Sequence, residues 1–166
     1  GIEGVANLDP GAVAVMGHSY GGWTSCKMPG IDSRIRAVCG LAPATEAFVG
    51  RKAFDEGELP FSGGQPTLLI AGTDDVLVDT ETSVAKLFDR LGAPRALVGI
   101  DGADHFHFCD AIPMLHGSAN EPLIWSAQVE QSCRWLLAFF TGAAAAPLGR
   151  RCHLKHRWAS SAHTIA

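Results

Sequence analysis

Mostly apolar runs alternate with amphipathic segments along this chain. Four short runs are bounded by glycine, proline or charged residues, and they cover 12–17, 35–42, 66–72 and 95–100. Such runs are typical of strands in a parallel sheet that helices cover on both faces. Helices are predicted over 21–29, 80–91 and 122–140. This alternation predicts right-handed βαβ units and an α/β fold.

The last two predicted helices should each turn an apolar face toward the sheet. In segment 80–91 the expected core residues are Val84, Leu87, Phe88 and Leu91. In segment 122–140 they are Ile124, Val129, Trp135, Leu136, Phe139 and Phe140. With 166 residues, the chain is long enough for one domain with a substantial core.

Two segments do not follow the alternation. Residues 44–65 mix charges, glycines and prolines with isolated apolar residues. We expect a lid or the wall of a substrate site there, with an ordinary surface loop as the alternative. Residues 143–166 show no apolar periodicity, and we expect a disordered basic tail. The folded domain is therefore predicted to span 1–142.

Composition and charge narrow the range of partners. The net charge is −4, and all 17 acidic residues precede the tail, which holds Arg150, Arg151, Lys155 and Arg157. A mildly acidic body argues against nucleic acid as the main partner. No apolar run reaches about 18 residues, so no membrane span is predicted. Because the chain begins with Gly1 and shows no leader, we expect a processed or partial cytoplasmic protein.

The cysteines are odd in number, widely spaced and without a C-x-x-C pair: Cys26, Cys39, Cys109, Cys133 and Cys152. This pattern favours buried free thiols in a reducing compartment, with one disulfide as the alternative. Metal ligation by Cys152 with His153 and His156, or by His107 and Cys109 with His105, is a second interpretation. The first group lies in the expected tail, and the second has no further ligands of suitable spacing nearby, so we predict no metal and no cofactor.

A G-x-S-x-G pattern follows the first predicted strand and precedes the first helix. In this strand–turn–helix context it predicts a sharp turn that exposes Ser19, the arrangement called a nucleophile elbow. Gly17 and Gly21 should remove side chains that would collide with the neighbouring strand and helix, and Gly22 should let the helix approach closely. The turn also directs the backbone N–H of Tyr20 toward any group bonded to Ser19.

A serine nucleophile needs a base and an acid that orients the base. The third strand ends in Gly-Thr-Asp-Asp, and we choose Asp75 as the acid, with Asp74 as the fallback and turn capping as the other interpretation. The fourth strand is followed by Gly-Ala-Asp-His-Phe, where His105 is the expected base. Asp104 is expected to order that loop. The order Ser, acid, His is the one found in parallel-sheet hydrolases.

These residues make the chain resemble the α/β-hydrolase superfamily over about residues 9–142. The resemblance is carried by Gly17-His18-Ser19-Tyr20-Gly21-Gly22, Gly72-Thr73-Asp74-Asp75 and Gly102-Ala103-Asp104-His105-Phe106. The branch that it most resembles contains dienelactone hydrolase-like, cutinase-like and platelet-activating-factor acetylhydrolase-like esterases. True dienelactone hydrolases typically have cysteine where this chain has Ser19, which counts against that particular activity.

The resemblance implies the C-terminal half of the fold, with about four parallel strands flanked by helices. The strand before Ser19 is then an unprotected sheet edge through which chains can self-associate. It also implies a second oxyanion donor on an earlier loop, outside this sequence.

The expected activity is hydrolysis of small or lipid-like carboxylic esters through Ser19, His105 and Asp75 without a cofactor. Tyr20 N–H is the expected oxyanion donor. A non-catalytic hydrolase-like fragment or pseudoenzyme is the first alternative, and a cofactor-free haloperoxidase-like activity is the second.

Overall fold

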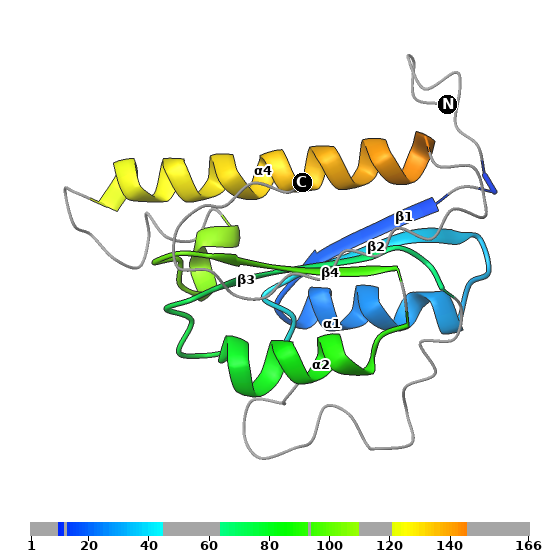
Figure 1. Cartoon of the computed structure of the whole chain (residues 1–166), viewed down its shortest axis with the longest axis horizontal. Helices are drawn as coiled ribbons and strands as arrows, with labels where there is room; N and C mark the ends of the chain where they lie inside the picture. Colours follow the sequence, from blue (N-terminus) through cyan, green and yellow to red (C-terminus); the bar gives the residue numbers. More distant parts are fainter. Residues whose placement is uncertain (1–9, 12, 45–63, 93, 110–120, 146–166) are drawn as a thin grey trace.

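The structure, a computed structural model, describes residues 10–11, 13–44, 64–92, 94–109 and 121–145, with side chains of the last segment described over 128–142 (Figure 1). The strands are β1 (Val13–His18), β2 (Ile35–Leu41), β3 (Thr67–Gly72) and β4 (Arg95–Ile100). The helices are α1 (Tyr20–Lys27), α2 (Ala85–Arg90) and α4 (Glu121–Ala145). Three short helical turns are η1 (Met28–Gly30), η2 (Thr80–Val84) and η3 (His105–Phe108).

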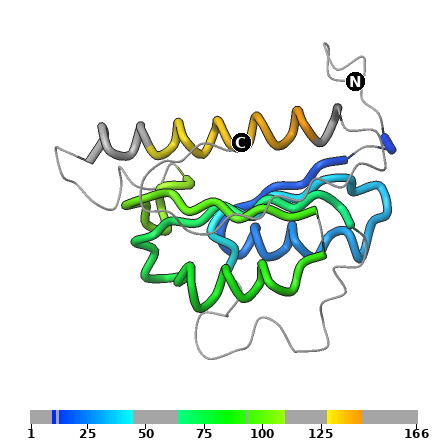
Figure 2. Tube along the Cα trace, viewed as in Figure 1, coloured from blue at the N-terminus to red at the C-terminus, as the bar shows by residue number. Residues whose placement is uncertain are grey.

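The four strands form one parallel sheet in the order β1-β2-β3-β4. Helices α1 and α2 lie along one face of this sheet and α4 crosses the other, as the traces in Figures 1 and 2 show. Because the strands are parallel, the loops that follow them all leave from the same edge of the sheet. The predicted α/β fold with a helix-flanked parallel sheet is confirmed.

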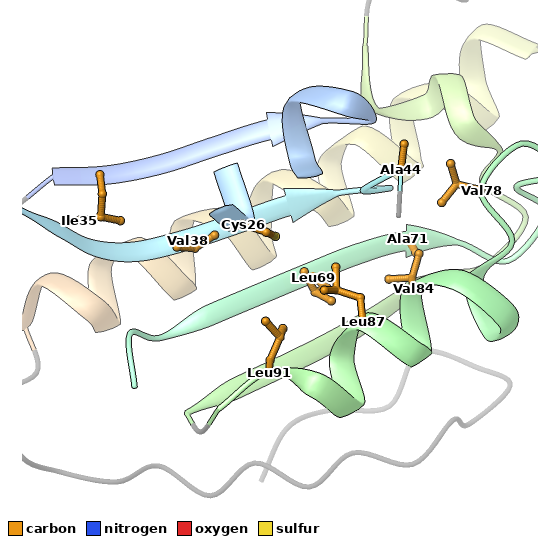
Figure 3. Packing of buried hydrophobic residues seen from close by; sticks show 10 residues of the cluster. All are labelled: Cys26, Ile35, Val38, Ala44, Leu69, Ala71, Val78, Val84, Leu87 and Leu91. Carbon is orange, nitrogen blue, oxygen red and sulfur yellow. The ribbon is translucent and has the colours of Figure 1, made fainter. Parts of the chain in front are cut away.

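Apolar side chains fill the space on both faces of the sheet. One cluster lies between the sheet and the helices α1 and α2, and it includes Cys26, Val38, Leu69, Val84 and Leu87 (Figure 3). A second cluster on the α4 side includes Cys39, Leu41, Leu68, Ile70 and Ile100. Leu69 and Ile70 belong to different clusters because successive side chains of a strand point to opposite faces. This two-sided burial explains why the strands carry few polar residues.

The predicted helix faces match most of this packing. Val84, Leu87 and Leu91 are buried and Phe88 packs against them, as expected. Trp135, Leu136, Phe139 and Phe140 pack against the second cluster. Val129 is half-buried, and the side chain of Ile124 lies outside the described residues.

The helix boundaries differ from the prediction in three places. The first helix changes to a 3₁₀ turn at Met28, since Pro29 has no N–H to continue the α-helical hydrogen bonds. The predicted helix 80–91 begins with a widened π turn, in which the amides of Ser83 and Val84 both donate to the Asp79 carbonyl. Helix α4 continues to Ala145, beyond its predicted end at residue 140. Residues 45–63 of the expected lid and 146–166 of the expected tail lie outside the described residues.

Strand β1 is at one edge of the described sheet, as the resemblance implied. Its side chains alternate in exposure: Val13 and Val15 pack against the first cluster, whereas Met16 on the opposite face is 51% exposed. No described helix combines the length and the hydropathy that a membrane crossing would require.

Candidate active site

Ser19 lies at the sharp turn between β1 and α1. Its backbone has φ 54° and ψ −120°, a left-handed conformation that costs roughly 1–3 kcal/mol for a residue with a side chain. Three backbone hydrogen bonds hold the turn: Ser19 N–H donates to the Leu41 carbonyl at 2.8 Å, and the Ser19 carbonyl accepts from Trp23 N–H and Ala44 N–H. The end of β2 and the start of α1 therefore fix Ser19 in a strained conformation at the turn.

Two of the three glycines around Ser19 are required by close backbone contacts. A Cβ on Gly17 would lie less than 3.0 Å from the carbonyl oxygen of Gly21, and a Cβ on Gly22 would lie 2.9 Å from that of Gly17. The prediction for Gly21 was wrong, because a Cβ there meets nothing within 4 Å. A Cβ on Gly17 would collide with the carbonyl of Gly21, whereas the space beside the Cα of Gly21 is open.

Asp75 follows β3 and is 4% exposed. Its Oδ1 accepts hydrogen bonds from the backbone amides of Leu77 and Val78, at 2.9 and 2.7 Å. Its Oδ2 lies 2.8 Å from Nδ1 of His105. The exposed Asp74 accepts a hydrogen bond from the Thr73 hydroxyl instead. Asp75 therefore both caps its own turn and faces the histidine.

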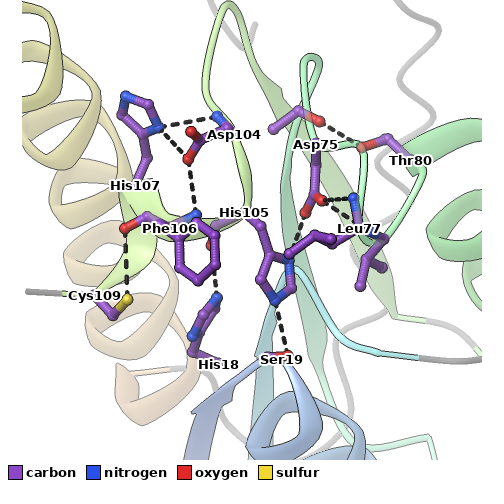
Figure 4. A network of polar contacts seen from close by, with 12 residues as sticks. His18, Ser19, Asp75, Leu77, Thr80, Asp104, His105, Phe106, His107 and Cys109 are labelled. Atoms are coloured by element: carbon purple, nitrogen blue, oxygen red, sulfur yellow. Dashed lines mark hydrogen bonds and ion pairs between the residues drawn. The ribbon is translucent and has the colours of Figure 1, made fainter. Parts of the chain in front are cut away.

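His105 begins η3 directly after β4 and is 4% exposed. Its Nε2 lies 2.8 Å from Oγ of Ser19, so its ring bridges Ser19 and Asp75 (Figure 4). Asp104 caps η3 by accepting from Phe106 N–H at 2.8 Å. The Nδ1 of His107 lies within hydrogen-bond distance of both Asp104 N–H and the Asp104 carboxylate; it accepts from the first or donates to the second. Asp104 and His107 thus order the loop that carries His105.

Hydrogen bonds and a close backbone contact hold the loops after β3 and β4 together. A Cβ on Gly72 would lie less than 3.0 Å from the Ala103 carbonyl oxygen, so only glycine fits there. That carbonyl accepts from Asp74 N–H at 3.0 Å, and Gly102 N–H donates to the Thr73 hydroxyl at 2.8 Å. These contacts fix the separation between the loop of Asp75 and the loop of His105.

The hydrogen bonds assign a donor or acceptor role to each ring nitrogen of His105. An ionised carboxylate can only accept, so Nδ1 carries the hydrogen toward Asp75. In the neutral ring Nε2 is then unprotonated and accepts the hydroxyl proton of Ser19. Tyr20 is the first residue of α1, where helix amides have no partner within the helix and favour negative charge. The arrangement can take up a proton from Ser19 and stabilise an anion beside it.

His18 is a residue whose contact with the site the sequence did not reveal. Its Nε2 lies 2.7 Å from the backbone carbonyl oxygen of His105, and the two rings lie 4.7 Å apart. Burial is the main reason that the pKa of His18 is lower than its usual value of 6.5. The only sequence signal for this contact is its place in the G-x-S-x-G turn, directly before Ser19.

The described cysteines are free thiols, and Cys109 Sγ donates to the Phe106 carbonyl at 3.5 Å at the end of η3, the turn that begins with His105 (Figure 4). Cys26 and Cys39 are buried free thiols, as expected, and burial raises the pKa of Cys26 to about 12. Cys109 is half-buried and Cys133 is exposed, so these two depart from the expected burial, and Cys152 lies outside the described residues. Among the described residues, no group of three or more His, Cys, Asp or Glu side chains is placed to hold a metal ion.

No family model and no curated protein sequence matches the chain. Solved structures do show similarity. The esterase domain of a Rhodothermus marinus protein is 22% identical with a TM-score of 0.47, and the match covers 55% of this chain and 50% of that one. An α/β serine hydrolase homologue from Coxiella burnetii is 22% identical with a TM-score of 0.44, covering 62% of this chain and 45% of that one. An α/β hydrolase from Penicillium sp. sh18 is 12% identical with a TM-score of 0.48, covering 74% and 63%. The chain thus spans about half the length of the first two of these proteins.

Proposed function

We propose that the chain carries the reactive centre of a serine hydrolase that cleaves carboxylic esters. The observation that carries this proposal is the pair of hydrogen bonds that links Ser19 Oγ, His105 and Asp75, both 2.8 Å long. A hydroxyl becomes a nucleophile when a base takes its proton and a third group orients that base. The two hydrogen bonds support Ser19 as the nucleophile, His105 as the base and Asp75 as the group that orients it.

In the first half of the reaction, Ser19 Oγ attacks the ester carbonyl carbon while its proton moves to Nε2 of His105. The carbonyl π electrons move to the oxygen, and the oxyanion accepts a hydrogen bond from Tyr20 N–H. Asp75 stabilises the imidazolium that forms on His105. As the tetrahedral intermediate collapses, the bond to the alcohol oxygen breaks, and Nε2 donates its proton to that alcohol. Ser19 is left acylated.

In the second half, Nε2 of His105 takes a proton from water as the water oxygen attacks the acyl carbon. Collapse of the second tetrahedral intermediate breaks the bond to Ser19 Oγ, which recovers its proton from His105. The products are a carboxylic acid and an alcohol, and water is the only co-reactant. The chain's own side chains provide every proton transfer in this sequence.

The resemblance of the G-H-S-Y-G-G turn to the esterase branch of the α/β-hydrolases supports an ester as the substrate. We take the substrate to be small or lipid-like, because exposed apolar side chains directly follow the acid: Val76 is 90% exposed and Leu77 is 45% exposed. The buried free thiols of Cys26 and Cys39 support a reducing compartment such as the cytoplasm. The position of β1 at an edge of the described sheet supports self-association at high concentration.

Labelling with a fluorophosphonate probe tests this proposal. We expect about one probe per folded chain, mapped to the peptide that contains Ser19 and absent from a Ser19→Ala variant. The variant should retain the circular dichroism spectrum of the wild type. A folded wild-type chain that takes up no probe at Ser19 would contradict the proposal and favour the non-catalytic alternative.

A matched pair of substrates tests the preference for esters. We expect turnover of a p-nitrophenyl ester to exceed that of the p-nitroanilide with the same acyl group. Equal turnover of both, lost in Ser19→Ala, would keep the serine mechanism and overturn the ester assignment.

A further inference from the structure

We propose that His18 is a positioning residue that holds the backbone of His105 in place for proton transfer from Ser19. This inference rests on the proposed function, since it concerns the base of the same site. It adds a role for a side chain that lies next to the nucleophile in the chain and is directed at the base in space (Figure 4).

The direction of the hydrogen bond follows from its chemistry. A backbone carbonyl oxygen can only accept, so the hydrogen must lie on Nε2 of His18. The separation of 2.7 Å is at the short end of the range for N–H···O bonds. The neutral ring in its Nε2–H form is sufficient for this contact, and no charge on His18 is needed.

The position of His18 makes this bond relevant to the reaction. His18 is the last residue of β1 and Ser19 is the next residue, so both are fixed by the same strand end. Ser19 Oγ contacts the ring of His105, and His18 contacts the backbone of the same residue. His105 is thereby held at two points relative to one rigid element. The contact with His18 fixes the backbone of His105, so that the ring, which Asp75 orients, stays within hydrogen-bond distance of Ser19.

The surroundings of His18 favour its neutral form, which is sufficient for this hydrogen bond. Its ring lies 4.7 Å from the ring of His105 and 6.1 Å from that of Phe108. The ionisable groups that act on it are His105 and Asp75, which have opposite effects, while burial disfavours its charged form. A neutral His18 places no opposing charge beside His105 when that residue accepts a proton.

A pair of variants separates the hydrogen bond from the bulk of the side chain. His18→Gln keeps an N–H donor at a similar reach, whereas His18→Phe keeps a ring and removes the donor. We expect His18→Phe to lower the rate constant of fluorophosphonate labelling by roughly 10- to 100-fold. His18→Gln should stay within about threefold of the wild type. With an ester substrate, the loss in His18→Phe should be in kcat, with little change in KM.

The inference is overturned if His18→Phe labels at the wild-type rate or if both variants lose the same amount. If His18→Phe does not fold, His18→Asn replaces it, because its shorter side chain does not reach the carbonyl. If the wild type itself does not label, the proposed function fails, and the ¹⁵N resonances of the His105 imidazole then provide the test. Loss of the donor should shift these resonances while His18→Gln preserves them, and unchanged resonances in both would overturn the inference.

Discussion

The carbonyl of Gly21 occupies the space where Gly17 would carry a side chain. A Cβ on Gly17 would lie less than 3.0 Å from both the carbonyl oxygen and the carbonyl carbon of Gly21. The first turn of α1 therefore passes directly against the end of β1, and this close approach makes the chain turn sharply at Ser19, which is half-buried. Gly21 itself has open space around its Cα.

This relationship predicts opposite outcomes for two similar substitutions. Gly17→Ala should destabilise the fold by about 3 kcal/mol or more, because both colliding groups belong to the backbone and cannot rotate away. Gly21→Ala should remain within about 1 kcal/mol of the wild type, since alanine is the better helix former. Urea unfolding of both variants measures the difference. Equal destabilisation by the two would contradict the packing of this turn.

Asp75 and Asp74 provide a second matched pair. In Asp75→Asn the side-chain oxygen can keep the hydrogen bonds to the amides of Leu77 and Val78, so the fold should survive. The NH₂ group would then face Nδ1 of His105 and favour the tautomer with hydrogen on Nε2, which cannot accept the Ser19 proton. We expect kcat to fall roughly 10³- to 10⁴-fold.

The control is Asp74→Asn, which removes a charge one residue away on an exposed side chain. Its kcat should remain close to that of the wild type. Steady-state kinetics with a p-nitrophenyl ester measures both variants. A larger loss in Asp74→Asn than in Asp75→Asn would transfer the acid role to Asp74.

The lowered pKa of His18 predicts a pH-dependent stability. Because burial lowers the pKa of His18, the folded residue is less protonated just below pH 6.5 than the same residue in the unfolded chain. The unfolded state thus binds more protons in this window, so the free energy of unfolding should fall as the pH drops from 6.5 through the folded pKa of His18. Urea unfolding at several pH values should show a smaller fall in His18→Gln. The same pH dependence in both proteins would argue against this assignment.

Much of the fold was predictable from local patterns. Strands β2 and β3 are buried almost throughout, and their apolar runs in the sequence reflect that burial directly. The residues of the site could also be predicted from the sequence. Ser19, Asp75 and His105 each follow a strand, and the carboxyl ends of parallel strands lie along one edge of a sheet. Residues from these loops therefore come together even when they are far apart in the sequence.

The remaining features depend on distances that no local pattern contains. The contact between His18 and His105 joins residues 87 positions apart and requires the assembled sheet. The different roles of Gly17 and Gly21 follow from which backbone atoms collide, although both residues look equivalent in the motif. The widened turn that begins at Thr80 also makes a contact outside its own segment, since the buried Thr80 hydroxyl donates to the Gly72 carbonyl at 2.6 Å.

The most direct test of the central claim is the mass of the protein after rapid mixing with p-nitrophenyl acetate and acid quenching. An activated ester acylates its nucleophile quickly, so an acyl-enzyme accumulates if Ser19 attacks the carbonyl. We predict one acetyl group per chain, located on Ser19 by peptide mapping and absent from Ser19→Ala. Ester turnover without acetylated Ser19, or a folded chain that is acetylated only elsewhere, would contradict the account.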